Sequence, residues 1–285
     1  MTLLQMEIFL EVVKNGGFTK AGEVLGLTQS AVSHAIAGLE SELGVSLLGR
    51  NRTGINLTYA GEQLLVHIRE ILYRTELIKQ EAAAINDLEM GTVRIGSFPS
   101  VSTKLLPGMI KSFKRNHPGI KIELLEGGYE DINKWIASAQ VDTGFVILPH
   151  KDFESVPILE DQYVLLLPED HPLSNKGCIH ISDIATEPFV MPLAGCEIFV
   201  RAIFKDNNIT PNIHYEIEQS TTITALVRDG LGISIVPEMI YIPPGVTTVK
   251  LKPELCRRIG LAVRSFQSSS PATRAFLNHA QSWVQ

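Results

Sequence analysis

The 285-residue sequence predicts an α+β, multi-domain fold. Three features indicate it: two short helical segments joined by a tight turn near the start, a long helical stretch at 59–88, and alternating strand and helix patterns beyond residue 91. We expect an N-terminal winged helix-turn-helix domain at 1–58, a long linker helix at 59–89 and a C-terminal α/β domain at 90–285.

Residues 18–33 have the pattern of a helix, a turn and a second helix. We expect Thr19 to cap the first helix, which ends before Gly26. Thr28 is expected to cap the second helix, which runs to about Leu43 with Gly44 as its stop signal. Apolar residues at spacings of three and four predict one buried stripe on this second helix, formed by Val32, Ala35, Ile36, Leu39 and Leu43.

The opposite face of the second helix carries short polar side chains. Such side chains let a helix enter the major groove closely, where Gln pairs with adenine and Ser donates or accepts. In helix-turn-helix docking, the N-terminal residues of this helix meet the bases. The predicted DNA-binding residues are therefore Gln29, Ser30, Ser33 and His34 for base contacts, with Lys20 and Thr28 beside them. The alternative is an ordinary helical hairpin with a solvated polar face.

Residues 47–57 predict a hairpin with basic residues near its tip. Arg50 and Arg52 are positioned to reach phosphates or a narrow minor groove, unless they are simply solvated loop arginines. Residues 1–60 carry four cationic side chains and five carboxylates, a formal net charge of −1. Binding to DNA would therefore depend on where the cations lie and on two copies acting together.

The predicted linker helix has no proline between Thr58 and Pro99. Its apolar residues recur at alternating steps of four and three, which is the pattern of a heptad seam. A helix over 59–88 would be about 45 Å long, too long for one small domain to cover. The predicted dimerisation residues are Leu64, Ile68, Ile71, Ile78 and Ile85. The alternative is a helix packed entirely against its own subunit.

The first 61 residues resemble the LysR-type transcriptional regulators. The matching elements are Gln29-Ser30-Ala31-Val32-Ser33, Leu39-Glu40, Leu43-Gly44, Arg50 and Leu57-Thr58-x-Ala60-Gly61, with a looser match at Gly230–Pro237. Gly22 stands where the family usually has alanine. The resemblance implies a bacterial regulator that binds double-stranded operator DNA as a homodimer or homotetramer, with RNA polymerase as a further partner.

The same resemblance implies a C-terminal two-lobed, periplasmic-binding-protein-like effector domain. Tyr163–Leu167 and Ile259–Val263 would be the crossovers between the lobes. Lobe I would hold about 91–161 and 266–285, and lobe II about 162–265. A small-molecule effector would then lie in the cleft between them.

Ligands of α/β domains lie beyond the carboxyl ends of strands, often at helix N-termini. Three predicted helix starts, at 98–102, 195–197 and 219–222, carry hydroxyls and free amides that suit an anion. Lys104 or Arg201 would supply a counter-charge. The predicted effector-binding residues are Ser100, Val101, Ser102, Val146, Cys196, Ser220 and Thr221. The alternative is plain N-capping by the serines, with Val146 in the core.

The remaining features favour a cytoplasmic location. No signal peptide opens the chain and no apolar run approaches 18 residues, so we expect no membrane contact. Three cysteines without a CxxC motif suit a reducing compartment. The scattered histidines lack metal-ligand spacing and no catalytic motif is present, so we expect no metal, no cofactor and no enzyme activity.

Cys196 offers an alternative, a thiol-based redox-sensing regulator. A helix N-terminus would lower the pKa of its thiol, whereas Glu197 would oppose that shift. Cys178 would be the resolving thiol. An enzyme acting on a small molecule is the second alternative.

Overall fold

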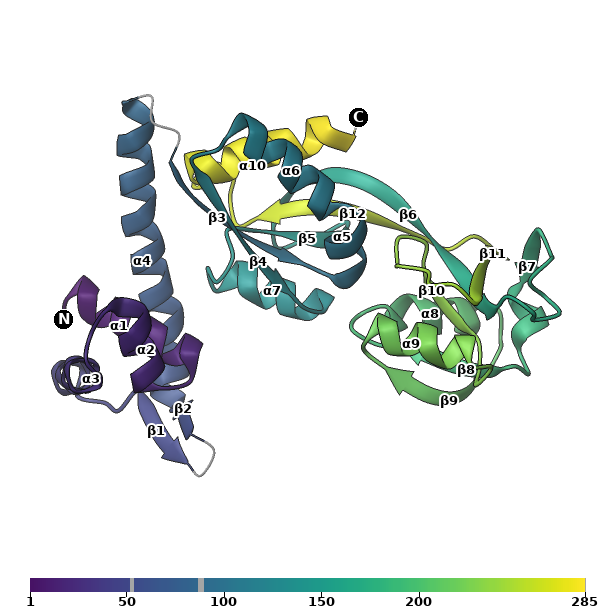
Figure 1. Cartoon of the computed structure of the whole chain (residues 1–285), viewed down its shortest axis with the longest axis horizontal. Coiled ribbons are helices and arrows are strands. Elements are labelled where there is room, and N and C mark those ends of the chain that lie inside the picture. The colour runs from purple at the N-terminus through teal and green to yellow at the C-terminus, as the bar shows by residue number, and fades with distance from the viewer. Residues whose placement is uncertain (52–53, 87–89, 285) are drawn as a thin grey trace. The chain divides into compact units, whose positions relative to one another are not determined.

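The computed structural model of the chain describes residues 1–51, 54–86 and 90–284. Two compact units divide it: residues 1–86 make up almost all of the first, and most of the remaining chain forms the second (Figure 1). Of the helices in the described parts of the chain, none is long and apolar enough to cross a membrane.

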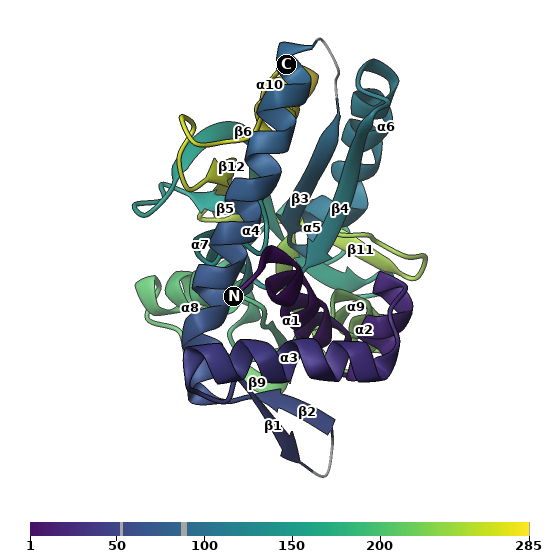
Figure 2. The ribbon, with the colours of Figure 1, turned by 90° about the vertical axis from the view of Figure 1, so that its left-hand side faces the viewer.

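The first unit begins with three helices around one apolar core, α1 (Leu3–Asn15), α2 (Phe18–Leu25) and α3 (Gln29–Leu43). Figure 2 shows α3 beside α1 and α2. The predicted stripe on α3 is confirmed, because Val32, Ile36 and Leu39 are buried in this core and Ala35 and Leu43 pack against it. Left-handed Gly26 and Gly44 end α2 and α3 as predicted.

The two predicted helix caps have different outcomes. The Thr28 hydroxyl accepts a hydrogen bond from the Ala31 amide at 3.2 Å, which confirms it as the cap of α3. The prediction for Thr19 is wrong, because α2 already begins at Phe18 and Gly17 stands at the cap position without a side-chain bond. The earlier start lets Phe18 pack against the core.

Gly22 fits the tight turn between α2 and α3. The Leu27 amide donates to the Gly22 carbonyl at 2.8 Å, which brings the turn back over the helix. A Cβ at position 22 would lie 2.6 Å from the Leu27 carbonyl oxygen. Alanine, the usual residue in the family, would therefore require this turn to shift.

The wing is an antiparallel hairpin of β1 (Leu48–Asn51) and β2 (Gly54–Leu57), with Leu48 opposite Leu57. Glu40 of α3 holds its first residues, because one carboxylate oxygen accepts from the Leu47 amide at 2.6 Å and the Leu48 amide at 3.1 Å. The hairpin is therefore fixed to the helix that carries the predicted base-reading face.

The long helix α4 (Tyr59–Ile85) follows the wing directly. The Thr58 hydroxyl caps it by accepting from the Gly61 amide at 3.0 Å and donates to the Ser46 carbonyl at 2.6 Å. A Cβ at Gly61 would lie only 2.1 Å from the Leu47 carbonyl oxygen, so only glycine allows this close approach. At 27 residues, α4 is about 40 Å long.

Lobe I of the second unit has a mixed sheet with helices packed against it (Figure 1). Strand β3 pairs in parallel with β4 and β5, and β12 pairs antiparallel with β5. The elements of lobe I are β3 (Gly91–Ser97), α5 (Pro99–Lys104), α6 (Leu106–Asn116), β4 (Ile120–Glu126), α7 (Tyr129–Ala137), β5 (Thr143–Leu148), β12 (Cys256–Val263) and α10 (Pro271–Val284).

Lobe II contains two further apolar clusters. Strands β8 and β9 form a parallel pair, and β7 lies parallel to β11. The elements of lobe II are β7 (Cys178–His180), the 3-10 helix Ile181–Ile184, β8 (Pro188–Pro192), α8 (Glu197–Asp206), β9 (Asn212–Ile217), α9 (Ser220–Arg228), β10 (Ser234–Pro237) and β11 (Val246–Lys252).

The long strand β6 (Glu154–Pro168) joins the lobes. Its first part pairs with β12, and its second part pairs with β10 and β11. Because β12 contributes Ile259 and Leu261 to the core of lobe I, the return crossover lies before Cys256, not near 265 as predicted. The apolar run Ile259–Val263 reflects an interior strand of lobe I.

Candidate DNA-binding face and inter-lobe pocket

The predicted base-reading residues share one open face of α3. Gln29, Ser30 and His34 are exposed and Ser33 is half-buried. The Thr28 hydroxyl, already engaged as the helix cap, lies 3.0 Å from the Ser30 hydroxyl. The face therefore combines solvent-accessible polar side chains with an N-terminus that is fixed by the Thr28 cap.

Two further features favour an anion at this end of α3. Lys20 on α2 is exposed, and the first turn of α3 holds no acidic residue. The unpaired amides and dipole of a helix N-terminus attract phosphate when no carboxylate neutralises them. Arg50 belongs to β1, but its side chain lies outside the described residues, as does all of Arg52.

The predicted seam of α4 divides into two parts. Ile68 is buried in the core of the first unit and Leu64 packs against it, so both stabilise their own subunit. By contrast, Ile71, Ile78 and Ile85 are 38, 70 and 83 % exposed. Only this second part remains available for a partner helix, because the winged domain already covers the beginning of α4.

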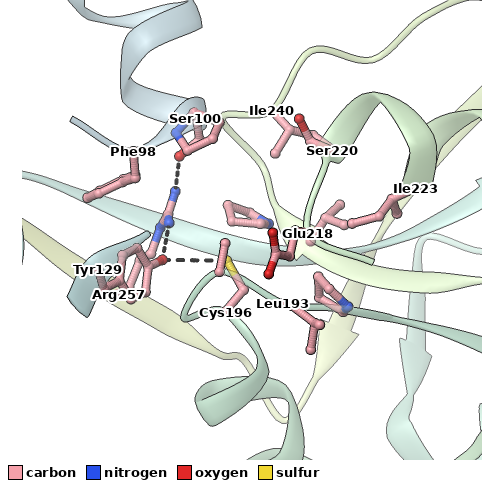
Figure 3. A pocket seen from close by; sticks show the side chains of 15 residues that line it. Phe98, Ser100, Tyr129, Leu193, Cys196, Glu218, Ser220, Ile223, Ile240 and Arg257 are labelled. Atoms are coloured by element: carbon pink, nitrogen blue, oxygen red, sulfur yellow. Dashed lines mark hydrogen bonds between the residues drawn. The ribbon is translucent and has the colours of Figure 1, made fainter. Parts of the chain in front are cut away.

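A pocket of about 450 Å³, partly open to solvent, lies between the lobes of the second unit (Figure 3). Segments from both lobes contribute to it. Its lining residues are Phe98, Pro99, Ser100, Tyr129, Pro192, Leu193, Ala194, Cys196, Glu218, Ser220, Ile223, Val236, Pro237, Ile240 and Arg257.

The pocket brings together three of the predicted effector-binding residues, Ser100, Cys196 and Ser220. Ser102 and Thr221 lie outside its lining. Val101 and Val146 are buried in the core of lobe I, so neither lines the pocket. The alternative that Val146 is a core residue is therefore the correct one. Adjacent helical residues point in directions about 100° apart, which is why Ser100 faces the pocket and Val101 does not.

Arg257 is the centre of the buried polar cluster that sequence reasoning missed. Its Nε and Nη2 donate to Oδ2 of Asp161 at 2.9 and 2.6 Å. Nη2 also donates to the Ser100 hydroxyl at 2.7 Å, and Nη1 to the Tyr129 hydroxyl at 2.6 Å (Figure 3). The guanidinium carbon lies 5.0 Å from the Phe98 ring centroid. No local pattern marks a buried arginine, so the sequence held no signal for it.

The charge of Arg257 is compensated inside the protein. Burial raises the pKa of Asp161, and the adjacent Arg257 opposes that rise. The two residues expected to supply a counter-charge for an anion do not line the pocket: Lys104 is exposed at the end of α5, and Arg201 pairs with Glu216. Across the described residues of its lining, the pocket therefore lacks the unpaired counter-charge that the predicted anion site would need.

The Cys196 thiol is also in a different environment from the predicted one. Burial raises its pKa, and the opposing influence of Arg257 is smaller. The predicted lowering by the helix N-terminus is therefore wrong, because desolvation outweighs it. All three cysteines are free, and a raised pKa leaves less of the reactive thiolate at neutral pH.

The lobes touch beside the pocket at Tyr129. Its amide donates to the Ala194 carbonyl at 3.4 Å, and its hydroxyl lies 3.6 Å from the Cys196 sulfur. Gly195 has a φ of +101°, and a Cβ there would lie 2.4 Å from the Tyr129 ring. The absence of a side chain at position 195 is thus what lets Tyr129 pack against lobe II.

A winged helix-turn-helix followed by a long helix and a two-lobed, pocket-bearing domain defines a class of bacterial transcriptional regulators. The chain belongs to the LysR family. Residues 3–62 match the model of the bacterial regulatory helix-turn-helix protein, lysR family, and residues 86–285 match the LysR substrate binding domain.

Individual relatives agree with this assignment. The HTH-type transcriptional regulator YvbU of Bacillus subtilis is 35 % identical over 99 % of this chain and 98 % of its own length. In fold, the chain resembles a full-length OxyR variant from Pseudomonas aeruginosa, with a TM-score of 0.75, 22 % identity and coverage of 99 and 95 %. It also resembles full-length CbnR complexed with its target DNA, with a TM-score of 0.72, 22 % identity and 99 % coverage of both chains.

Proposed function

We propose that this LysR-family protein binds double-stranded operator DNA as a homodimer or homotetramer and responds to a small effector in the inter-lobe pocket. The domain division that we propose is a winged domain at 1–58, a linker helix at 59–89 and an effector domain at 90–285. The protein acts as a cytoplasmic regulator rather than an enzyme, with RNA polymerase as its further partner.

The open polar face of α3 is the observation that carries this proposal. Gln29, Ser30, Ser33 and His34 lie on it, and the opposite face is committed to the core. Gln and Ser side chains at this end of a recognition helix pair with base edges in the major groove. Lys20 and the wing arginines Arg50 and Arg52 would contact phosphates or the minor groove. The related fold of CbnR, solved with its target DNA, supports this use of the domain.

Oligomerisation would use the exposed part of α4. Two copies joined through Ile71, Ile78 and Ile85 would bury side chains that are exposed in one chain. Ile78→Glu should therefore dissociate the oligomer, as measured by light scattering, whereas Lys79→Glu, at the adjacent exposed position, should not. An Ile78→Glu protein with the mass of the wild-type oligomer would contradict this role for the seam.

The effector acts by preferring one arrangement of the lobes. Because the pocket is lined from both lobes, a ligand there would bind different arrangements of the lobes with different affinity. That difference sets the largest shift in population that the ligand can cause. The linker helices would carry the shift to the spacing of the DNA-binding domains.

The proposal is tested by operator binding. A promoter fragment selected from genomic DNA by the wild-type protein is titrated with the Gln29→Ala variant at fixed salt concentration. Each lost base contact should weaken binding by about 1–3 kcal/mol. Ser41→Ala, in the last turns of α3, is the matched control and should bind normally. Failure of the wild type to select any fragment, or normal binding by Gln29→Ala, would contradict the assignment.

A further inference from the structure

A closed ion pair borders the inter-lobe pocket. Of the described residues that line it, only Arg257 is cationic. Its partner Asp161 accepts two hydrogen bonds from it, and their side chains are only 1 and 2 % exposed. The two charges therefore cancel within the buried site, and little of the arginine's charge remains for a ligand.

Glu218 supplies a carboxylate to the pocket lining. It is an exposed residue between β9 and α9, and Figure 3 shows its carboxylate turned toward the cavity. Counted formally, Glu218 and the Arg257–Asp161 pair together carry a charge of −1. An anionic ligand would lose hydration and also meet this negative charge.

The hydroxyls of the pocket are suited to a neutral acceptor. The Ser100 hydroxyl accepts from Nη2 of Arg257 at 2.7 Å, so its own proton is available to donate. Ser220 lines the pocket from lobe II. Hydroxyl donors pair with carbonyl, ether or hydroxyl oxygens without any charge on the ligand.

The rest of the lining is mostly apolar. Leu193, Ile223, Val236 and Ile240 form much of the wall contributed by lobe II. Such a wall favours a ligand that buries apolar surface and carries few polar atoms.

We propose that the effector is an uncharged, largely apolar small molecule whose hydrogen-bond acceptor meets the Ser100 hydroxyl. This inference rests on the proposed function, because it names the ligand class of the same regulatory pocket. An effector carboxylate would need a counter-charge, which Arg257 does not supply while it is paired with Asp161.

The Cys196 thiol provides a probe of charge inside the pocket. Full-length protein carrying Cys178→Ser and Cys256→Ser keeps Cys196 as its only thiol. Three methanethiosulfonates with the same ethyl arm, ending in a hydroxyl, a sulfonate or an ammonium group, are reacted with it. In each case the thiolate attacks the sulfenyl sulfur, a disulfide forms and methanesulfinate leaves. Each rate constant is divided by that of 2-mercaptoethanol with the same reagent.

The hydroxyl reagent should give the highest normalised rate, because either charged reagent loses hydration on entering the buried site. The sulfonate reagent is also repelled by Glu218 and should be at least about fivefold slower. Glu218→Gln should raise the sulfonate rate relative to the hydroxyl rate about threefold. Glu254→Gln is the matched control, because it removes an exposed carboxylate of lobe II that does not line this pocket. It should leave the ratio unchanged.

Two results would overturn the proposal. A sulfonate rate equal to or above the hydroxyl rate would show a site that accepts anions. An ammonium rate above both would show a cation site governed by Glu218. No DNA is present in this experiment, so a failure here is distinguished from a failure of operator binding.

Discussion

The polar face of α3 and the polar cluster around Arg257 are built in opposite ways. The first comes from neighbouring residues on one helix and is open to solvent. The second joins side chains as far apart in sequence as Ser100 and Arg257, and its arginine side chain is 1 % exposed. Substitutions on α3 should therefore change binding with little effect on stability, whereas substitutions in the Arg257 cluster should first change stability.

The largest effect is expected for Asp161→Asn. It leaves the buried Arg257 without its charged partner and should lower the free energy of unfolding by about 3–5 kcal/mol. Both tryptophans, Trp135 on α7 and Trp283 on α10, lie in the second unit, so urea unfolding followed by fluorescence reports on it. Asp229→Asn, which breaks an exposed pair with Arg228, should leave the free energy of unfolding almost unchanged, because solvent screens exposed pairs. Equal losses of stability in the two variants would show that the buried Arg257 cluster is no more important for stability than an exposed ion pair.

A smaller loss is expected for Gly195→Ala. The added methyl group meets the Tyr129 ring and the backbone keeps a φ of +101°, which together should cost about 1–3 kcal/mol. The same change should expose Cys196, so its thiol should react faster than in the wild type. Gly177→Ala is the control, because a Cβ there meets no atom within 4 Å. An unchanged Cys196 rate in Gly195→Ala would show that this contact does not hold the lobes together.

Much of the first unit could be predicted because its signals are local. Thr28, Gly26 and Gly44 end or begin helices by their own side-chain and backbone chemistry, and the spacing of Val32, Ile36 and Leu39 marks the buried face. Thr19 failed as a cap because the packing of Phe18, a tertiary contact, decided where α2 begins.

The pocket could be predicted only in part. Ser100, Cys196 and Ser220 were found because helix starts are visible in the sequence. Tyr129, Glu218 and Arg257 belong to segments far apart in the sequence, and only the fold of the two lobes brings them to the same cavity. The sequence also could not show that the α4 seam has a buried part and an exposed part, because this depends on which side chains the winged domain covers.

A modest effect is expected for Thr28→Ala. Loss of the hydrogen bond from the Ala31 amide should lower the stability of α3 by about 1 kcal/mol. Circular dichroism of the full chain should then show a slightly earlier loss of helix on heating. Thr19→Ala is a matched control, because that exposed side chain caps no helix. Equal shifts for both variants would mean that the cap adds nothing beyond helix propensity.

Two matched serine substitutions test the central claim, that one surface reads DNA and a separate pocket regulates it. Operator affinity is measured without effector for Ser33→Ala and Ser100→Ala at the same salt concentration. Ser33→Ala should weaken binding by about 1–3 kcal/mol, and Ser100→Ala should bind as the wild type does. Normal operator binding by Ser33→Ala, or an equal loss in both variants, would contradict the account.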